Sequence, residues 1–280
     1  MKKLIWLTAI LLGLLALEPA LADTSTSTAT STGQSQAVIE DGISQLLEAK
    51  GNPALSPNER LGKEITAREK IISTALTLSL KESTTMRDNL QGLPAFATSS
   101  QAYAMESGYL ANLVAYDAFY KAEQGKLWSA ENNPYLNSSD LNDSLKALAN
   151  EIKDYRETFS SPQIKAMTDF YLAFYTQNSI SVAGDRLSKI SDEIKNLENL
   201  SILQSGAFDN DLSQANALLN EAGQFDQNAQ YLILTPVDQL NETSTSSTPE
   251  DLIKSSLIDL SKAYGILLKV GQRLSQGVGQ

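Results

Sequence analysis

The chain has 280 residues and a net charge of −11, and it contains neither histidine nor cysteine. It therefore has no imidazole base, no thiolate nucleophile, no disulfide and no zinc site built from Cys or His. The acidic balance disfavours nucleic acid and anionic lipid as partners. Hydrophobic residues make up 42% of the chain, which is enough for a packed core and excludes disorder over the whole length.

The first 22 residues have the pattern of a secretory signal peptide. Lys2 and Lys3 give a positive start, Leu4–Leu17 is almost wholly apolar, and Ala20 and Ala22 supply the small residues of a cleavage pattern. The alternative is an uncleaved anchor helix, but the apolar run is shorter than the roughly 20 residues that a membrane-spanning helix needs. We therefore expect cleavage after Ala22 and a secreted or periplasmic location.

Three polar stretches organise the remaining chain. Residues 23–36 form a Ser/Thr tract without a large apolar residue, so we expect a flexible leader there. Turn-forming residues between 125 and 139 predict an internal break, and the polar stretch 241–248 predicts a flexible linker before the last helix. The sequence thus predicts one helical domain over 37–280. The linker would allow the last helix to pack on its own chain or to exchange into a partner.

Elsewhere, apolar residues recur every three or four positions, which predicts amphipathic helices. One such stripe consists of Leu141, Leu145, Leu148, Ile152, Tyr155 and Phe159. Four more stripes keep a similar spacing over Leu61–Leu80, Met105–Tyr120, Ala183–Leu197 and Ile253–Leu274. Each stripe has polar residues on the opposite side, so each helix has one face to bury.

Helix start signals accompany these stripes. Ser56–Glu59 (SPNE) is a capping box with proline at the first helical position, and Thr248–Asp251 (TPED) is the same device with an aspartate. Ser161-Pro162 is expected to start another helix. Strand signals are almost absent, and the short run Tyr231–Leu234 is expected to end a helix. We predict an all-α fold, an antiparallel bundle of about five to seven helices behind a disordered leader.

Motifs for catalysis are missing from the sequence. It has no P-loop, dinucleotide-binding fingerprint, nucleophile elbow or EF-hand calcium loop, and no motif assigns it to a family. Two carboxylic acids can hydrolyse a glycosidic bond without histidine or cysteine. Asp154–Glu157 and Asp192–Glu193 are acid-rich, but neighbouring stripe residues place both segments on solvated helix faces. We expect no catalytic, cofactor-binding or metal-ligating residue.

Aromatic residues concentrate between Phe96 and Tyr175. They either form the core of the middle helices or line a groove for a sugar or a peptide. Trp128 lies outside every stripe, which makes it the aromatic residue to test for ligand contact.

These observations favour an exported, non-enzymatic helical protein of the bacterial envelope or secretome. We expect it to bind an unidentified protein or glycan, or to act as a scaffold, without a cofactor. The main alternative is a carboxylate-based hydrolase acting on envelope glycans. A pore former is disfavoured because no uncharged segment of the mature chain approaches the roughly 20 residues of a membrane span.

Overall fold

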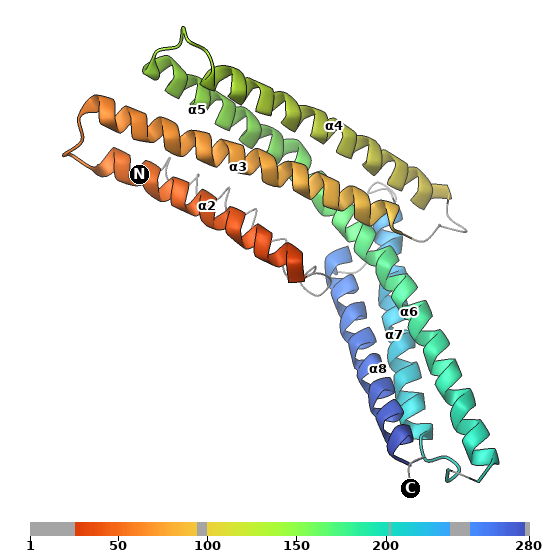
Figure 1. Cartoon of the computed structure of the whole chain (residues 1–280). Coiled ribbons are helices and arrows are strands. Elements are labelled where there is room, and N and C mark those ends of the chain that lie inside the picture. Colours follow the sequence, from red (N-terminus) through yellow and green to blue (C-terminus); the bar gives the residue numbers. More distant parts are fainter. Residues whose placement is uncertain (1–25, 94–99, 202, 236–246, 278–280) are drawn as a thin grey trace. The chain divides into compact units, whose positions relative to one another are not determined.

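A computed structural model describes residues 26–93, 100–201, 203–235 and 247–277. Its helices are α2 (Thr26–Gly51), α3 (Pro57–Gln91), α4 (Ser100–Glu131), α5 (Ser138–Tyr155), the π-helix η1 (Arg156–Ser160), α6 (Ser161–Asn199), α7 (Asp209–Leu234) and α8 (Pro249–Gly277) (Figure 1). No strand occurs within these ranges. Since α5, η1 and α6 follow one another without interruption, the helices form six rods, which confirms the predicted fold class and helix number.

The chain forms two compact units, and the helical domain that the sequence predicted over 37–280 spans parts of both. Unit 1 consists of Met1–Arg87 and Tyr109–Gln163, and unit 2 of Asp88–Gly108 and Ile164–Gln280. Apolar spacing shows which face of a helix is buried, but it does not show which other helix covers that face. The number of cores therefore could not be predicted from the stripes.

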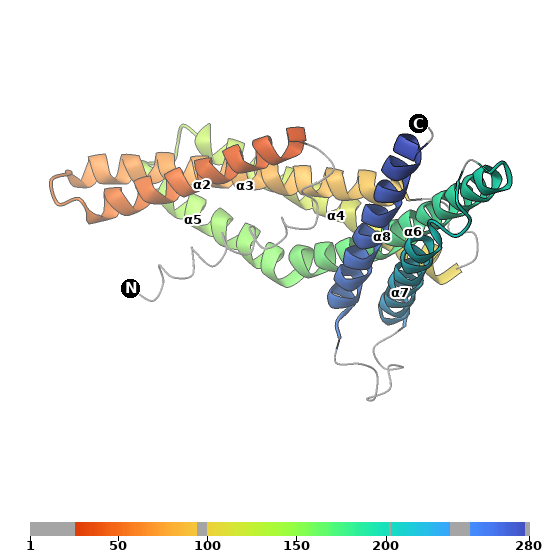
Figure 2. The same ribbon diagram turned by 90° about the horizontal axis from the view of Figure 1, so that it is seen from below.

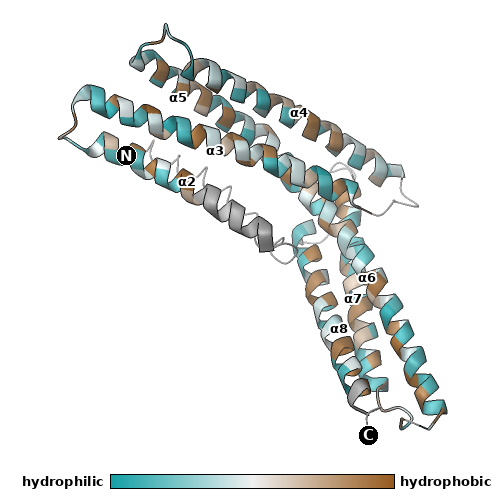
Figure 3. Ribbon diagram, viewed as in Figure 1, coloured by the Kyte–Doolittle hydropathy of each residue, from teal (hydrophilic) through white to brown (hydrophobic). Residues whose placement is uncertain are grey.

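Unit 1 contains two helical hairpins, α2–α3 and α4–α5, which can be followed in Figures 1 and 2. Its buried apolar residues come from all four helices and include Ile39, Leu46, Ile65, Ile72, Leu76, Leu113, Leu145, Leu148 and Ile152. Most of these residues belong to the predicted stripes. The apolar residues appear as brown segments between teal ones along each helix in Figure 3.

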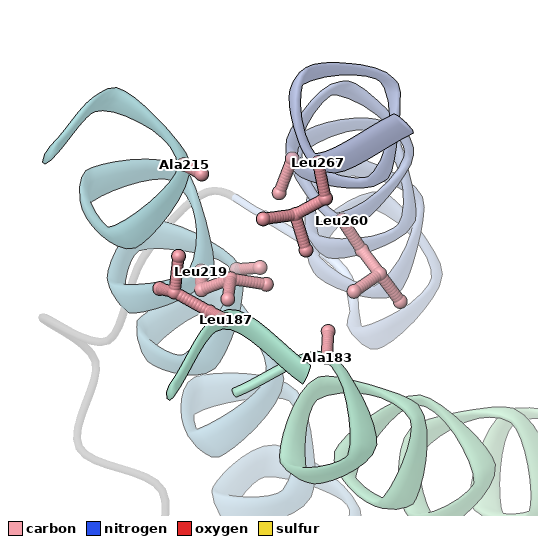
Figure 4. Packing of buried hydrophobic residues seen from close by; sticks show 8 residues of the cluster. Ala183, Leu187, Ala215, Leu219, Leu260 and Leu267 are labelled. Atoms are coloured by element: carbon pink, nitrogen blue, oxygen red, sulfur yellow. The ribbon is translucent and has the colours of Figure 1, made fainter. Parts of the chain in front are cut away.

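Unit 2 is built mainly from α6, α7 and α8, and α7 packs closely against α8. One apolar cluster of this unit joins the three helices, with Ala183 and Leu187 from α6, Ala215, Leu219 and Ala222 from α7, and Leu260, Ala263 and Leu267 from α8 (Figure 4). Small alanines opposite leucines let the helices interdigitate at this level.

Both predicted capping boxes form. The Ser56 backbone N–H donates to Glu59 Oε2 at 2.9 Å, and the Glu59 N–H donates to Ser56 Oγ at 3.3 Å. At the start of α8, the N–H groups of Thr248 and Asp251 each donate to the other residue's side chain at 3.2 Å. These bonds satisfy backbone donors that a helix start leaves unpaired.

The rod formed by α5, η1 and α6 departs from the prediction at two points. Helix α6 begins at Ser161, as the Ser161-Pro162 pair predicted, but η1 joins it to α5 without a break. Pro162 lacks the N–H that would pair with the carbonyl of Thr158. The wider π turn, Arg156–Ser160, includes Thr158 and so lies where this hydrogen bond is missing. Phe159, expected in the buried stripe, is 46% exposed.

The extra residue of the wide turn explains why Phe159 leaves the buried face. From Ile152 the buried positions continue at Arg156, Ser160 and Ile164, in three successive steps of four residues. A regular α-helix alternates steps of three and four along one face. A π turn takes more residues than an α turn, so the buried position moves from Phe159 to Ser160, the residue that follows it.

The polar stretches are only partly within the described residues. Helix α2 begins at Thr26, and residues 23–25 of the leader predicted over 23–36 lie outside the described residues. No proline interrupts α2, and Ser and Thr cost a propagating helix less than 1 kcal/mol each. The signal peptide, including Ala20 and Ala22, and residues 241–246 of the linker also lie outside the description. Helix α7 ends at Leu234, as predicted.

Candidate functional site

The internal break predicted between 125 and 139 is a turn of residues 132–137 between α4 and α5, inside unit 1. The Asn132 amide donates to the Trp128 carbonyl at 2.8 Å, and Asn133 Oδ1 accepts the Tyr135 N–H at 3.0 Å. Asn137 Oδ1 accepts two N–H groups of the first turn of α5 at 3.0 Å each. Three asparagine side chains therefore pair the backbone on both sides of the turn and fix its conformation.

This turn region presents two aromatic rings to solvent. Trp128, the residue that the sequence selected for ligand contact, is 65% exposed near the end of α4. Tyr135, which the sequence analysis did not single out, is 93% exposed within the turn. Rings this exposed add little to the stability of the fold, so both are available for contact with another molecule.

Helix α4 also has an exposed stripe that the sequence analysis missed. Its members are small and alternate in steps of four and three: Ala111, Ala115, Ala118, Ala122, Gly125 and Ser129. Beside them Val114 is 62% exposed, and a Cβ added at Gly125 would meet nothing within 4 Å. We name these small residues, together with Val114 and Trp128, the α4 outer surface. The stripe follows the same recurrence every three or four positions as the apolar stripes, but it consists of small residues.

Although the chain is acidic, this part of α4 has no exposed acidic side chain before Glu131. Glu123 is buried, with its Oε1 2.9 Å from the Lys126 Nζ. Asp117 is half-buried and accepts a 2.6 Å hydrogen bond from Arg87. Burial alone would raise the pKa of Asp117, but hydrogen bonds and the charge of Arg87 hold that pKa below its usual value. Asp117 and Glu123 thus serve the interior of unit 1.

The described rings of the aromatic-rich region mostly belong to the core. In unit 1, Phe119 stacks on Tyr155 with ring centroids 3.7 Å apart. Tyr116 and Tyr120, both buried, meet Tyr155 edge-on at 6.1 and 5.8 Å. In unit 2, Phe170 and Phe174 are a buried pair at 4.7 Å. These contacts favour the core interpretation over a groove lined by the same rings.

The acid-rich segments have their acidic side chains on exposed helix faces. Asp154 and Glu157 are exposed in unit 1, and Asp192 and Glu193 are exposed in unit 2. Within the described ranges, no group of three or more acidic side chains is placed to hold a metal ion. The exposure of these four acids agrees with the solvated helix faces that the sequence predicted for both segments.

Comparison with known proteins does not identify a relative. No protein-family model matches the chain, and neither the curated proteins nor the solved structures contain a significant match. Among the described helices, none combines the length and apolar character needed to cross a membrane. Fold and surface together define an all-α protein of two helical units, one of which exposes a helix face of small residues.

Proposed function

We propose that the protein is an exported, non-enzymatic helical protein that binds a helix of a partner protein through the α4 outer surface. The observation that carries the proposal is the stripe of exposed small residues from Ala111 to Ser129. Small side chains allow a second helix to approach the backbone of α4 closely. Val114 and Trp128 add larger apolar contacts toward the two ends of the stripe.

The distribution of charge supports the same surface. The net charge of −11 disfavours contact with other acidic proteins. The α4 outer surface lacks exposed acids between Ala111 and Ala130, so no exposed carboxylate of this stretch repels a partner there. Secretion or transport to the periplasm, as the signal-peptide pattern suggests, would place this binding role in the bacterial envelope or outside the cell.

The absence of cysteine allows a site-specific test. Ala118→Cys introduces a single thiol at the centre of the α4 outer surface, to which a maleimide-linked photo-crosslinker can be attached. The matched control is Ser144→Cys, at an exposed position of α5 in the same unit. Each labelled mature protein is illuminated with envelope extract of the producing cell, adducts are identified by mass spectrometry, and binding is repeated with the purified partner.

We expect one partner to be cross-linked from position 118 and not from position 144. Ala118→Arg should abolish binding of that purified partner while leaving the unfolding curve of the protein unchanged, because position 118 is exposed. An adduct between two copies of the chain would identify the partner as a second copy and support a scaffolding role. No adduct, or the same adducts from both positions, would overturn the proposal.

The non-enzymatic part of the proposal has its own test. Purified mature protein is incubated with envelope glycans and with peptides, and products are followed by mass spectrometry. We expect no turnover. Turnover that disappears in Glu157→Gln or Asp192→Asn would instead support the carboxylate-based hydrolase.

A further inference from the structure

Helices α6, α7 and α8 each bury a polar side chain in the middle part of unit 2. These residues are Thr176 on α6, Asp226 on α7 and Ser256 on α8, and all three are almost completely removed from solvent. The Ser256 hydroxyl donates to the backbone carbonyl of Ala222 at 2.8 Å, which ties α8 to α7. We name these three residues the unit 2 polar layer.

The unit 2 polar layer lies between two apolar clusters. One cluster contains Ala173, Ala229, Leu252 and Ile253, and the other is the larger cluster of Figure 4. On every helix the polar residue stands between a member of each cluster: Thr176 between Ala173 and Ala183, Asp226 between Ala229 and Ala222, and Ser256 between Ile253 and Leu260. Each residue of the unit 2 polar layer therefore has buried apolar residues before and after it on its own helix.

The hydrogen bonding of this layer is incomplete. Asp226 is 1% exposed, and its Oδ2 accepts a 2.7 Å hydrogen bond from the Gln230 amide. Its Oδ1 and the Thr176 hydroxyl have no hydrogen-bond partner within the described part of the chain. A buried carboxylate without a counter-ion is unfavourable, whereas a neutral carboxyl removes the charge and gains an O–H donor. Burial accordingly raises the pKa of Asp226 to about 7, against the opposing effect of Gln230.

The charged groups near the unit 2 polar layer either form ion pairs within their own helix or lie partly or fully in solvent. On α6, Lys165 Nζ is 3.3 Å from Asp169, and on α8, Lys262 Nζ is 2.7 Å from Asp259. On the part of α4 in unit 2, Glu106 is half-buried, and burial raises its pKa as well. The remaining charged residues on the nearby turns of α6, α7 and α8 are exposed: Asp185, Arg186, Glu221, Glu250, Asp251 and Lys254.

We propose that the unit 2 polar layer is a pH-dependent lock, in which a proton on Asp226 tightens the packing of α7 against α6 and α8 and its loss loosens that packing. The proton comes from water and occupies Oδ1, where it supplies a donor. The unpaired Thr176 hydroxyl oxygen is an acceptor of the kind that this donor needs. Because the carboxyl binds its proton more tightly in the folded chain than in the unfolded chain, stability falls as the pH rises toward and through neutrality.

The test uses the full mature chain and hydrogen–deuterium exchange of α7 and α8 between pH 5 and pH 8, corrected for the intrinsic exchange rate. Asp226→Asn keeps the shape and the acceptor for Gln230 but stays neutral at every pH. Asp259→Asn, a largely buried acid of α8 with its own lysine, is the matched control. We expect wild-type protection to fall by roughly 10- to 100-fold over this range. The reason is that the Asp226 carboxyl loses its proton about three pH units higher in the folded chain than in the unfolded chain.

Asp226→Asn should show nearly constant protection from pH 5 to pH 8, while Asp259→Asn should follow the wild type. Wild-type protection that does not change with pH, or an Asp226→Asn protein that keeps the wild-type dependence, would overturn the proposal. If Asp226→Asn does not fold, the side-chain carboxyl carbon of Asp226 is titrated by NMR in the wild type. A midpoint near 7 supports the lock, and a midpoint near 4 overturns it.

Discussion

The guanidinium group of Arg156 lies 3.1 Å from Glu82 Oε2, and it also donates to the Ser79 hydroxyl at 2.9 Å. Arg156 is the first residue of η1, whereas its two partners belong to α3. The wide turn of the long helical rod is thus fixed to a neighbouring helix by one buried cation. Because η1 brings Arg156 onto the buried face, the ion pair and the wide turn depend on each other.

Removal of one partner of this ion pair should destabilise unit 1. Glu82→Gln leaves the Arg156 charge buried without a counter-ion, and we expect a loss of about 2–3 kcal/mol, somewhat below the range for fully buried pairs because Glu82 is partly exposed. Arg156→Met combined with Glu82→Gln should cost less than the sum of the two single changes. Urea unfolding followed by circular dichroism measures this, and additive effects would contradict the coupling.

Two buried tyrosines of α4 should respond oppositely to loss of their hydroxyl groups. Tyr120 Oη lies 2.7 Å from the Ser160 hydroxyl, so Tyr120→Phe should cost about 1 kcal/mol. Tyr116 Oη is buried without a partner among the described residues, so Tyr116→Phe should be neutral or stabilising by up to about 1 kcal/mol. Each variant is the control for the other in the same unfolding experiment. Equal losses would show that the Tyr116 hydroxyl has a partner after all.

Alkaline pH should reveal the buried hydroxyl of Tyr116 in a second way. Burial raises the pKa of Tyr116 to about 12, with smaller contributions from Tyr155 and Tyr120. The unfolded chain ionises near 10, so this group's contribution to stability is complete below pH 10 and is lost as the pH rises to 12. Unfolding midpoints measured from pH 9 to pH 12 should fall less steeply for Tyr116→Phe than for the wild type. Parallel curves would refute the assignment.

Two glycines should differ in their response to alanine. A Cβ on Gly42 of α2 would lie 2.7 Å from Ile71 Cγ1 of α3, whereas a Cβ on Gly62 would meet nothing within 4 Å. Gly62→Ala should stabilise the protein by about 0.5–1 kcal/mol through helix propensity. Gly42→Ala gains the same propensity but forces α2 and α3 apart, and we expect a net loss of about 1 kcal/mol. Thermal unfolding compares the two, and a stabilised Gly42→Ala would contradict the close approach.

Export can be tested directly at the N-terminus. Protein recovered from the periplasm or the medium should begin at Asp23, as N-terminal sequencing would show. Ala22→Arg should block cleavage and leave the precursor in the membrane fraction. A recovered protein that begins at Met1 would support the uncleaved anchor helix.

The sequence was most informative where structure depends on neighbouring residues. The capping boxes at Ser56 and Thr248 need only residues three apart, and both form as predicted. The stripe from Ile253 to Leu274 needs only helical periodicity, and most of its large residues face the core. Such features require no knowledge of which helices pack together.

Helix faces made of small residues could not be recognised from the spacing of large apolar residues. The buried face of α7 follows the 3–4 spacing through Ala215, Leu219, Ala222, Asp226 and Ala229. Because three of its members are alanine, the stripe does not stand out, and Asp226 within it resembles a solvated acid. The α4 outer surface was overlooked for the same reason. The unit 2 polar layer could have been predicted from one observation. Asp226 occupies a position of the 3–4 stripe on α7, where the other small members are alanine.

The π-helix has a consequence for the evolution of this chain. Between Ile152 and Ile164 the rod uses one residue more than a regular α-helix needs to return to the same face. A homologue with a regular helix here would keep the buried positions on both sides but lack that residue. A correct alignment with it would therefore contain a single-residue gap in the middle of an unbroken helix, and an ungapped alignment would shift every core position of α6 by one.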